Sequence, residues 1–145
     1  MVSFSDYDTY RKIEKYLNDY TILDEKINIL KSIIKDSEYN QNYARYIKHR
    51  SSSLEDLVIR NIELEQKINK IGKWKSLITI VFNNYKSKNE LFYNFLILKY
   101  IDKVDPSDIQ EKLDLSLQQQ KDIEAKILRY IFLLAIKNKM LKEVS

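Results

Sequence analysis

The sequence contains no cysteine, and it has one proline, one glycine and one histidine among 145 residues. Without cysteine the chain has no disulfide framework and no thiolate ligand for a metal. With so few chain breakers it lacks the turns that an all-β domain needs, so we expect long, uninterrupted helices. These absences predict an all-α protein.

Residues for catalysis are equally scarce. Nucleophilic dyads, zinc sites and nucleotide-binding loops need cysteine, several histidines or a glycine-rich loop after a strand, and the sequence offers none of these. The single histidine, His49, lies in a polar stretch, where a solvated residue is the expected role. We therefore expect no enzyme activity, no catalytic or metal site and no cofactor.

Long apolar runs are also missing. The longest, from Tyr130 to Ile136, is much shorter than the roughly 20 residues that cross a bilayer. The N-terminus lacks the basic and apolar regions of a secretory signal. This predicts a cytoplasmic protein with no membrane partner. The abundance of lysine, isoleucine, asparagine and tyrosine is typical of AT-rich genomes, so a bacterial host cell or its phage is the expected setting.

What the sequence does have is hydrophobic periodicity. From Tyr7 to Lys35, and again from Ser53 to about Tyr85, apolar side chains recur every seven residues, which is typical of helices that pack along a seam. Two such helices favour an antiparallel pair within one chain. The alternative is a dimeric coiled coil, a homodimer whose register Asn61 would help to set. Gly72 costs about 1 kcal/mol relative to alanine inside a helix, so a break there is left open.

Between these helices the stretch from 36 to 53 is polar and rich in tyrosine, and it has neither helical nor strand periodicity. We interpret it as a loop. Its basic cluster of Arg45, Lys48 and Arg50 is a candidate contact for a phosphate backbone or an acidic partner, with ordinary solvated surface as the alternative. The loop and its flanking helices make up the first region, residues 1–86.

The second region, residues 87–145, carries signals for two closely spaced helix starts. Asp105 precedes Pro106, and proline is best tolerated in the first turn of a helix. Ser116 and Gln119 have the spacing of a capping box only a few residues after that helix has begun. Two helices so close must cross at a steep angle, which predicts a helix-turn-helix.

The turn of this motif reads Leu113-Asp114-Leu115-Ser116, and Ile123 and Ile127 follow it at helical spacing. This stretch resembles the helix-turn-helix of sigma factor region four. Placed after two long helices, it is similar to the phage late-transcription regulators of the RinA and ArpU type. The sequence departs from the family pattern at three positions, where alanine, glycine and valine are common: Gln110, Asp114 and Gln120.

The resemblance implies a transcription regulator that binds promoter DNA, and it implies RNA polymerase or another regulator as a protein partner. The first turn of a recognition helix reaches base edges in double-stranded DNA. Glutamine pairs with adenine, while lysine and serine hold phosphates. Our candidate nucleic-acid-binding residues are Ser116, Gln118, Gln119, Lys121, Lys126 and Arg129.

The distribution of charge favours an alternative. The whole chain has a net charge of +4, but residues 91–145 carry nine basic and eight acidic side chains. A strong duplex binder concentrates lysine and arginine on its docking face, because neutralisation of phosphates supplies most of the affinity. The alternative is therefore a non-enzymatic protein–protein interaction module that has lost DNA reading and binds another regulator.

Overall fold

The computed structural model describes residues 4–46 and 51–140, in which there are six α-helices and no β-strand. The all-α prediction is confirmed. These residues form two compact units, which we call the hairpin unit (residues 22–74) and the core unit (described residues 4–21 and 75–140). The elements are α1 (Phe4–Asn18), η1 (Tyr20–Ile22), α2 (Leu23–Tyr46), α3 (Ser51–Lys88), α4 (Glu90–Leu96), η2 (Ile97–Ile101), α5 (Pro106–Leu113) and α6 (Leu117–Lys137).

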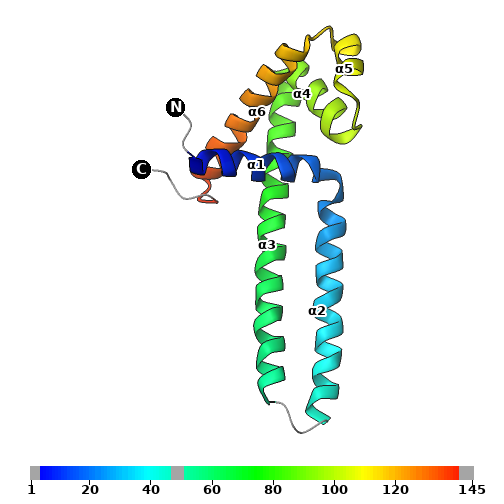
Figure 1. Cartoon of the computed structure of the whole chain (residues 1–145), viewed down its shortest axis with the longest axis vertical. Helices are drawn as coiled ribbons and strands as arrows, with labels where there is room; N and C mark the ends of the chain where they lie inside the picture. The colour runs from blue at the N-terminus through cyan, green and yellow to red at the C-terminus, as the bar shows by residue number, and fades with distance from the viewer. Residues whose placement is uncertain (1–3, 47–50, 141–145) are drawn as a thin grey trace. The chain divides into compact units, whose positions relative to one another are not determined.

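The hairpin unit pairs α2 with the first part of α3, and the two segments run side by side in opposite directions (Figure 1). The order of charged residues along the two helices favours the antiparallel arrangement. Asp24 and Glu25 open α2, and Lys70 and Lys73 lie near the end of the hairpin part of α3. An antiparallel pair brings these opposite charges to the same end of the unit.

The prediction of a single helix from Tyr7 to Lys35 is wrong. α1 ends at Asn18, the 3-10 turn η1 follows, and α2 starts at Leu23. The break falls in a short stretch that contains asparagine, aspartate and threonine, and all three have low helix propensity. Two acidic residues in the first turn of α2 then favour a new helix start, because they complement the positive end of the helix dipole.

The predicted loop at 36–53 is mostly wrong as well. α2 continues to Tyr46 and α3 begins at Ser51, so helix covers this stretch on both sides of residues 47–50, which lie outside the described residues. The stretch lacks a hydrophobic period, but from 36 to 46 it also lacks glycine and proline. The absence of chain breakers permits a helix, so the missing period did not exclude one.

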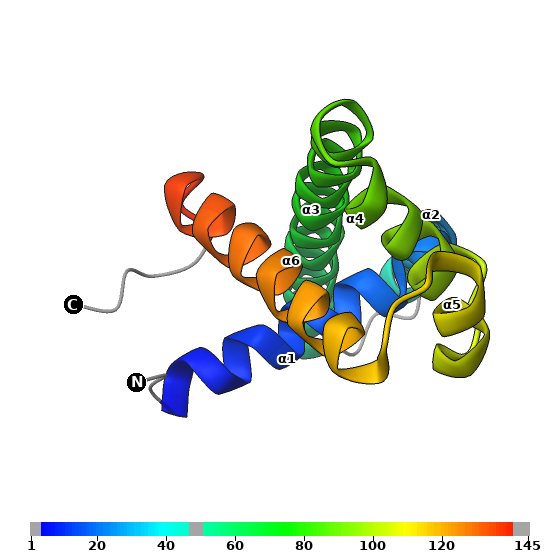
Figure 2. The ribbon, with the colours of Figure 1, turned by 90° about the horizontal axis from the view of Figure 1, so that it is seen from above.

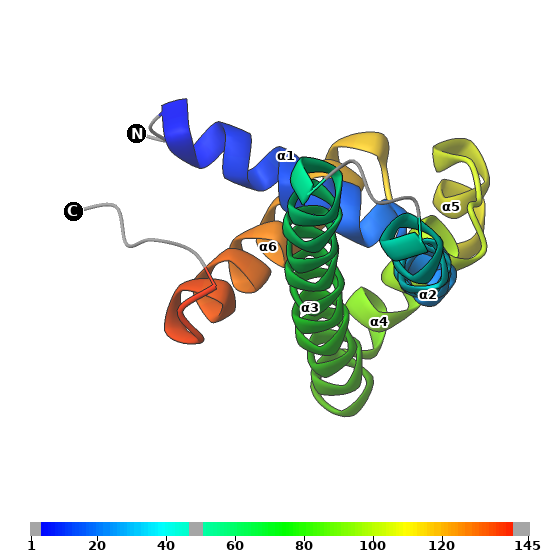
Figure 3. The same cartoon turned by 90° about the horizontal axis from the view of Figure 1, so that it is seen from below.

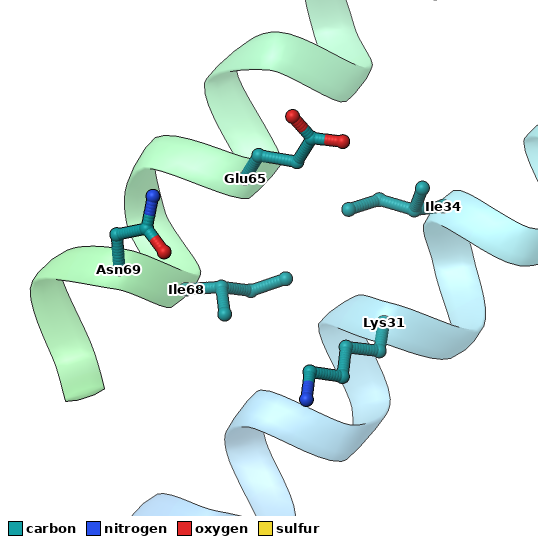
Figure 4. Close-up of a pocket in the computed structure, with 5 residues that line it drawn as sticks. All are labelled: Lys31, Ile34, Glu65, Ile68 and Asn69. Carbon is teal, nitrogen blue, oxygen red and sulfur yellow. The ribbon is translucent and has the colours of Figure 1, made fainter.

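The seam of the hairpin is loosely filled. Ile34 points from α2 and Ile68 from α3 into the space between the helices, and both are half-buried (Figure 4). Together with Lys31, Glu65 and Asn69 they line a cavity of about 330 Å³. Apolar side chains that face a cavity lack part of the van der Waals attraction that close packing would give them.

Asn61, the polar residue that interrupts the heptads of α3, is buried. Its side chain is 9% exposed, and its Oδ1 accepts no hydrogen bond. A buried carbonyl oxygen without a donor costs free energy that an apolar residue at the same position would not. Asn61 therefore weakens the seam in which it lies.

The second long helix was predicted from Ser53 to about Tyr85, and α3 extends from Ser51 to Lys88. It is helical through Gly72, where the sequence left a break open. A Cβ built at Gly72 meets no atom within 4 Å, so close approach of another element does not require glycine there. The helical segments on both sides continue through this glycine.

In the core unit, α1 packs against α6, as Figures 2 and 3 show from opposite sides. The rings of Tyr10 and Phe132 lie 5.2 Å apart between these helices. η1 joins the second part of α3, because Tyr20 stacks on Phe82 at 5.1 Å and shares a 2.6 Å hydrogen bond with Thr79. The apolar side chains with no exposed surface are Ile13, Leu17, Ile78, Val81, Phe95, Leu96, Tyr100, Ile109, Ile127, Ile131 and Ala135.

The segment after α3 packs against both helices of the predicted helix-turn-helix. Asn89 caps α4 by accepting a hydrogen bond from the Phe92 amide at 3.2 Å. α4 then passes into the π-helical turn η2, in which the Asp102 amide bonds to the Ile97 carbonyl, and this turn carries the buried Tyr100. A π-turn of this kind is rare and short, and here it contains a side chain of the core.

Candidate nucleic-acid interface

The first helix of the predicted motif, α5, begins as expected at Pro106 with Asp105 in the N-cap position. The Asp105 side chain accepts no hydrogen bond from the helix; its carbonyl accepts from the Asp108 and Ile109 amides instead. α5 ends at Leu113, and Ile109 is fully buried. This gives a helix of about two turns, as a scaffold helix requires.

Asp114 makes the turn by adopting the left-handed conformation, with φ 54° and ψ 45°. Glycine enters this region without strain. Aspartate is among the few other residues that tolerate it, because its short side chain bonds locally. The departure at Asp114 therefore leaves the turn intact.

The second helix, α6, starts from a complete capping box. The Ser116 Oγ accepts from the Gln119 amide at 3.1 Å, and the Gln119 Oε1 accepts from the Ser116 amide at 2.8 Å. Leu115, just before the cap, is buried. The sequence prediction of this cap is confirmed, and it places the start of α6 only a few residues after the end of α5.

Gln120 holds the two helices together. It is 6% exposed, and its Nε2 donates to the carbonyl of Pro106 at 2.9 Å and to that of Leu115 at 3.2 Å. One side chain on α6 thus satisfies a carbonyl in α5 and another in the turn. Hydrogen bonds to two backbone carbonyls therefore join α6 to α5 and to the turn at this buried position.

A polar cluster fixes the middle of α6. The Glu124 carboxylate accepts from the Tyr100 hydroxyl at 3.3 Å and pairs with the Lys99 ammonium at 2.7 Å. Glu14 on α1 faces the same carboxylate, and burial, a hydrogen bond to Glu124 and repulsion from it raise the pKa of Glu14, partly offset by Lys99. Burial and the two carboxylates also raise the pKa of Tyr100. Glu124 therefore points into the fold, not toward an approaching ligand.

The exposed face of α6 continues from its first turn along the helix. Gln118, Lys121, Asp122, Ala125 and Arg129 are all exposed, and their spacing of three and four residues places them on one side. The Gln118 Nε2 donates to the Asp122 carboxylate at 3.1 Å. This side offers two cations, an amide that is partly engaged and one carboxylate.

The structure divides the predicted site residues into groups. Ser116 and Gln119 are exposed but engaged in the capping box, and Lys126 lies around the helix from the face just described. Arg45 lies in the last turns of α2, in the other unit. Lys48 and Arg50 lie outside the described residues.

One exposed side chain escaped the sequence analysis. Leu117, the first residue of α6, is 53% exposed beside the polar start of the helix. An apolar contact from this position suits the methyl group of thymine. The signal in the sequence was a leucine directly after a predicted N-cap.

The described residues contain no cluster of histidine, cysteine, aspartate or glutamate that would hold a metal ion. Among them no helix is long and apolar enough to cross a membrane. We find no family model that matches the chain, and no curated protein or solved structure with significant similarity to it.

Proposed function

We propose that this protein binds double-stranded DNA through α5 and α6 and regulates transcription, in the manner of the phage late-transcription regulators that its sequence resembles. The observation that carries the proposal is the turn at Asp114. A left-handed residue, a buried leucine and a capped helix start follow one another in the order that a helix-turn-helix requires.

In this proposal α6 is the recognition helix and α5 lies across the DNA backbone. Gln118 and Leu117 read base edges, the first by hydrogen bonds and the second by contact with thymine methyl groups. Lys121 and Arg129 hold phosphates on either side of the groove, and Lys126 adds a third phosphate contact. Ser116 and Gln119 act indirectly, because their side chains set the start of the helix.

The direct test replaces the two side chains at the tip of α6. Gln118→Ala with Lys121→Ala is expected to weaken binding to a selected duplex by about tenfold, or 1.4 kcal/mol, without changing helical content. The matched control is Gln66→Ala with Lys70→Ala, a glutamine and a lysine exposed on α3. Unchanged binding in the α6 variant would refute the assignment of the recognition helix.

A second candidate function is binding to another protein. The charges of the proposed helix-turn-helix favour it. Residues 105–124 hold six acidic and two basic side chains. Asp122 lies in the middle of the exposed face of α6 and engages the amide of Gln118. Acidic side chains are repelled by phosphate. In this function the motif presents a folded surface to another regulator.

The two functions respond differently to one substitution. Asp122→Asn removes the repulsion and should strengthen DNA binding severalfold if α6 enters the groove. If the motif instead uses this acid to contact a protein, DNA binding stays undetectable in both the parent and the variant. Fluorescence anisotropy with one duplex at low salt distinguishes these results.

A further inference from the structure

The second half of α6 carries a surface of its own. From Ala125 to Met140 the chain has no acidic side chain, whereas residues 105–124 are strongly acidic. The positive charge of the helix is therefore concentrated away from the turn. Four basic side chains provide it: Lys126, Arg129, Lys137 and Lys139.

These cations border an open groove of about 390 Å³ whose floor is apolar. Leu133 is 53% exposed although it lies within a helix that is otherwise well buried on one side. Tyr130 is held in place, because its hydroxyl accepts from the Asn84 amide at 2.9 Å and its ring meets Tyr85 edge-on at 5.4 Å. The described residues that line the groove are Lys126, Arg129, Tyr130, Leu133, Leu134 and Lys137.

DNA bound at the tip of α6 would leave this floor uncovered. Leu133 follows Gln118 by about four turns, which is about 22 Å along a helix. The major groove is only about 12 Å wide, so it accommodates the first turns of a recognition helix and not its distal end. A ligand that covers Leu133 and Lys137 would therefore be a different one.

We propose that the groove binds an acidic amphipathic helix of a partner protein. Apolar side chains of that helix would cover Leu133 and Leu134, and its carboxylates would lie beside Lys137, which the proposed DNA contact does not use. The chemistry of the groove selects this occupant. A phosphate backbone would use the cations and leave the leucines in water, and an uncharged apolar helix would leave the cations without partners. This inference does not depend on DNA binding by the tip of α6.

The test uses a fluorescent synthetic peptide of about 18 residues, helical and amphipathic, with leucine on one face and glutamate on the other. A second peptide has lysine in place of every glutamate. The full chain is titrated into each, and anisotropy is read. We expect the acidic peptide to bind and the basic peptide not to bind.

Two variants of α6 and two matched controls complete the test. Leu133→Asp and Lys137→Glu should each weaken binding of the acidic peptide by about fivefold to tenfold. Ile59→Asp is the control for the first, because Ile59 is 54% exposed on α3, and Lys73→Glu is the control for the second. Circular dichroism verifies that all four variants fold.

The proposal is overturned by any of four results. They are no binding of the acidic peptide, equal binding of both peptides, equal effects of the α6 variants and their controls, and a Leu133→Asp variant that binds the peptide normally but no longer binds a duplex. The solution mass of the protein is recorded alongside. Self-association that disappears in Leu133→Asp would assign the groove to a second copy of the chain instead.

Discussion

The core unit and the hairpin unit are built from similar amphipathic helices, yet they bury apolar side chains to different extents. Ile78, Phe95 and Ile127 in the core unit have no exposed surface. In the hairpin unit Ile29 is 53% exposed and Ile62 is 50% exposed. The core unit encloses its side chains among several helices, whereas a pair of helices covers only one side of each partner.

This difference shows what a heptad pattern does and does not determine. The pattern identifies the side of a helix that faces a partner. The apolar heptad residues of α3 whose burial is described face the interior of their own unit. The pattern does not state how many helices complete the packing. We therefore expect most of the folding free energy to reside in the core unit, with the hairpin unit opening more readily.

The largest effect is expected from replacing a buried isoleucine by alanine, and the same replacement in the other unit gives the comparison. Ile127→Ala in the core unit should lower the free energy of unfolding by about 3–4 kcal/mol, because it leaves a cavity in a fully buried site. Ile68→Ala in the hairpin should cost about 1 kcal/mol, since Ile68 already borders a cavity. Urea denaturation measures both. Equal effects of the two substitutions would contradict the difference in packing between the units.

The next effect concerns Gln120, the buried side chain that joins α5 and α6 in the proposed helix-turn-helix. Gln120→Ala should cost about 2 kcal/mol, because two backbone carbonyls are deprived of their donor and a void replaces the side chain. Gln110→Ala, at an exposed position of α5, should change stability by less than about 0.5 kcal/mol. If both variants were equally stable, Gln120 would not be the anchor of the motif.

A smaller effect is expected in the hairpin unit. Gly72→Ala should raise the free energy of unfolding by about 0.5–1 kcal/mol, since the position is helical and has space for a methyl group. Thermal and urea denaturation provide the measurement. A decrease in stability would mean that the helix bends at Gly72 in solution and needs its glycine.

The smallest effect depends on pH. The pKa of Glu14 is raised in the folded state, so folding favours the protonated carboxyl. Its contribution to stability is therefore present below the ordinary value of about 4.5 and is lost as pH rises above it. Glu14→Gln should match the parent protein at about pH 4 and exceed it by a few tenths of a kcal/mol at about pH 7. The same gain at both pH values would rule out the raised pKa of Glu14, which burial causes first and Glu124 second, as the reason for the gain.

Sequence reasoning found the elements that have strong local signals. Asp105 and Pro106 marked the start of α5, and the Ser116–Gln119 capping box marked the start of α6. It missed the break after Asn18, because the heptad spacing of the apolar residues continues across it. It also missed the helix from 36 to 46, because that stretch has no hydrophobic period in the sequence.

The candidate site was predictable only in part. Its position on α6 followed from the cap, and Gln118, Lys121 and Arg129 are exposed as binding requires. The role of Gln120 was not evident, because only the packing of α5 on α6 brings its amide to the carbonyls of Pro106 and Leu115. The distal groove was hidden for the same reason, since exposure of Leu133 depends on which helices cover α6.

The most direct test of the proposed function is a salt titration of binding to a short DNA duplex by fluorescence anisotropy. For the parent protein we expect affinity to fall steeply between about 50 and 200 mM salt, as phosphate binding releases counterions. Replacing Lys121, Lys126 and Arg129 by alanine should reduce the slope of log affinity against log salt by about 0.9 for each phosphate that is no longer neutralised. No binding of the parent protein at the lowest salt, or an unchanged slope in the variant, would contradict DNA binding by α6.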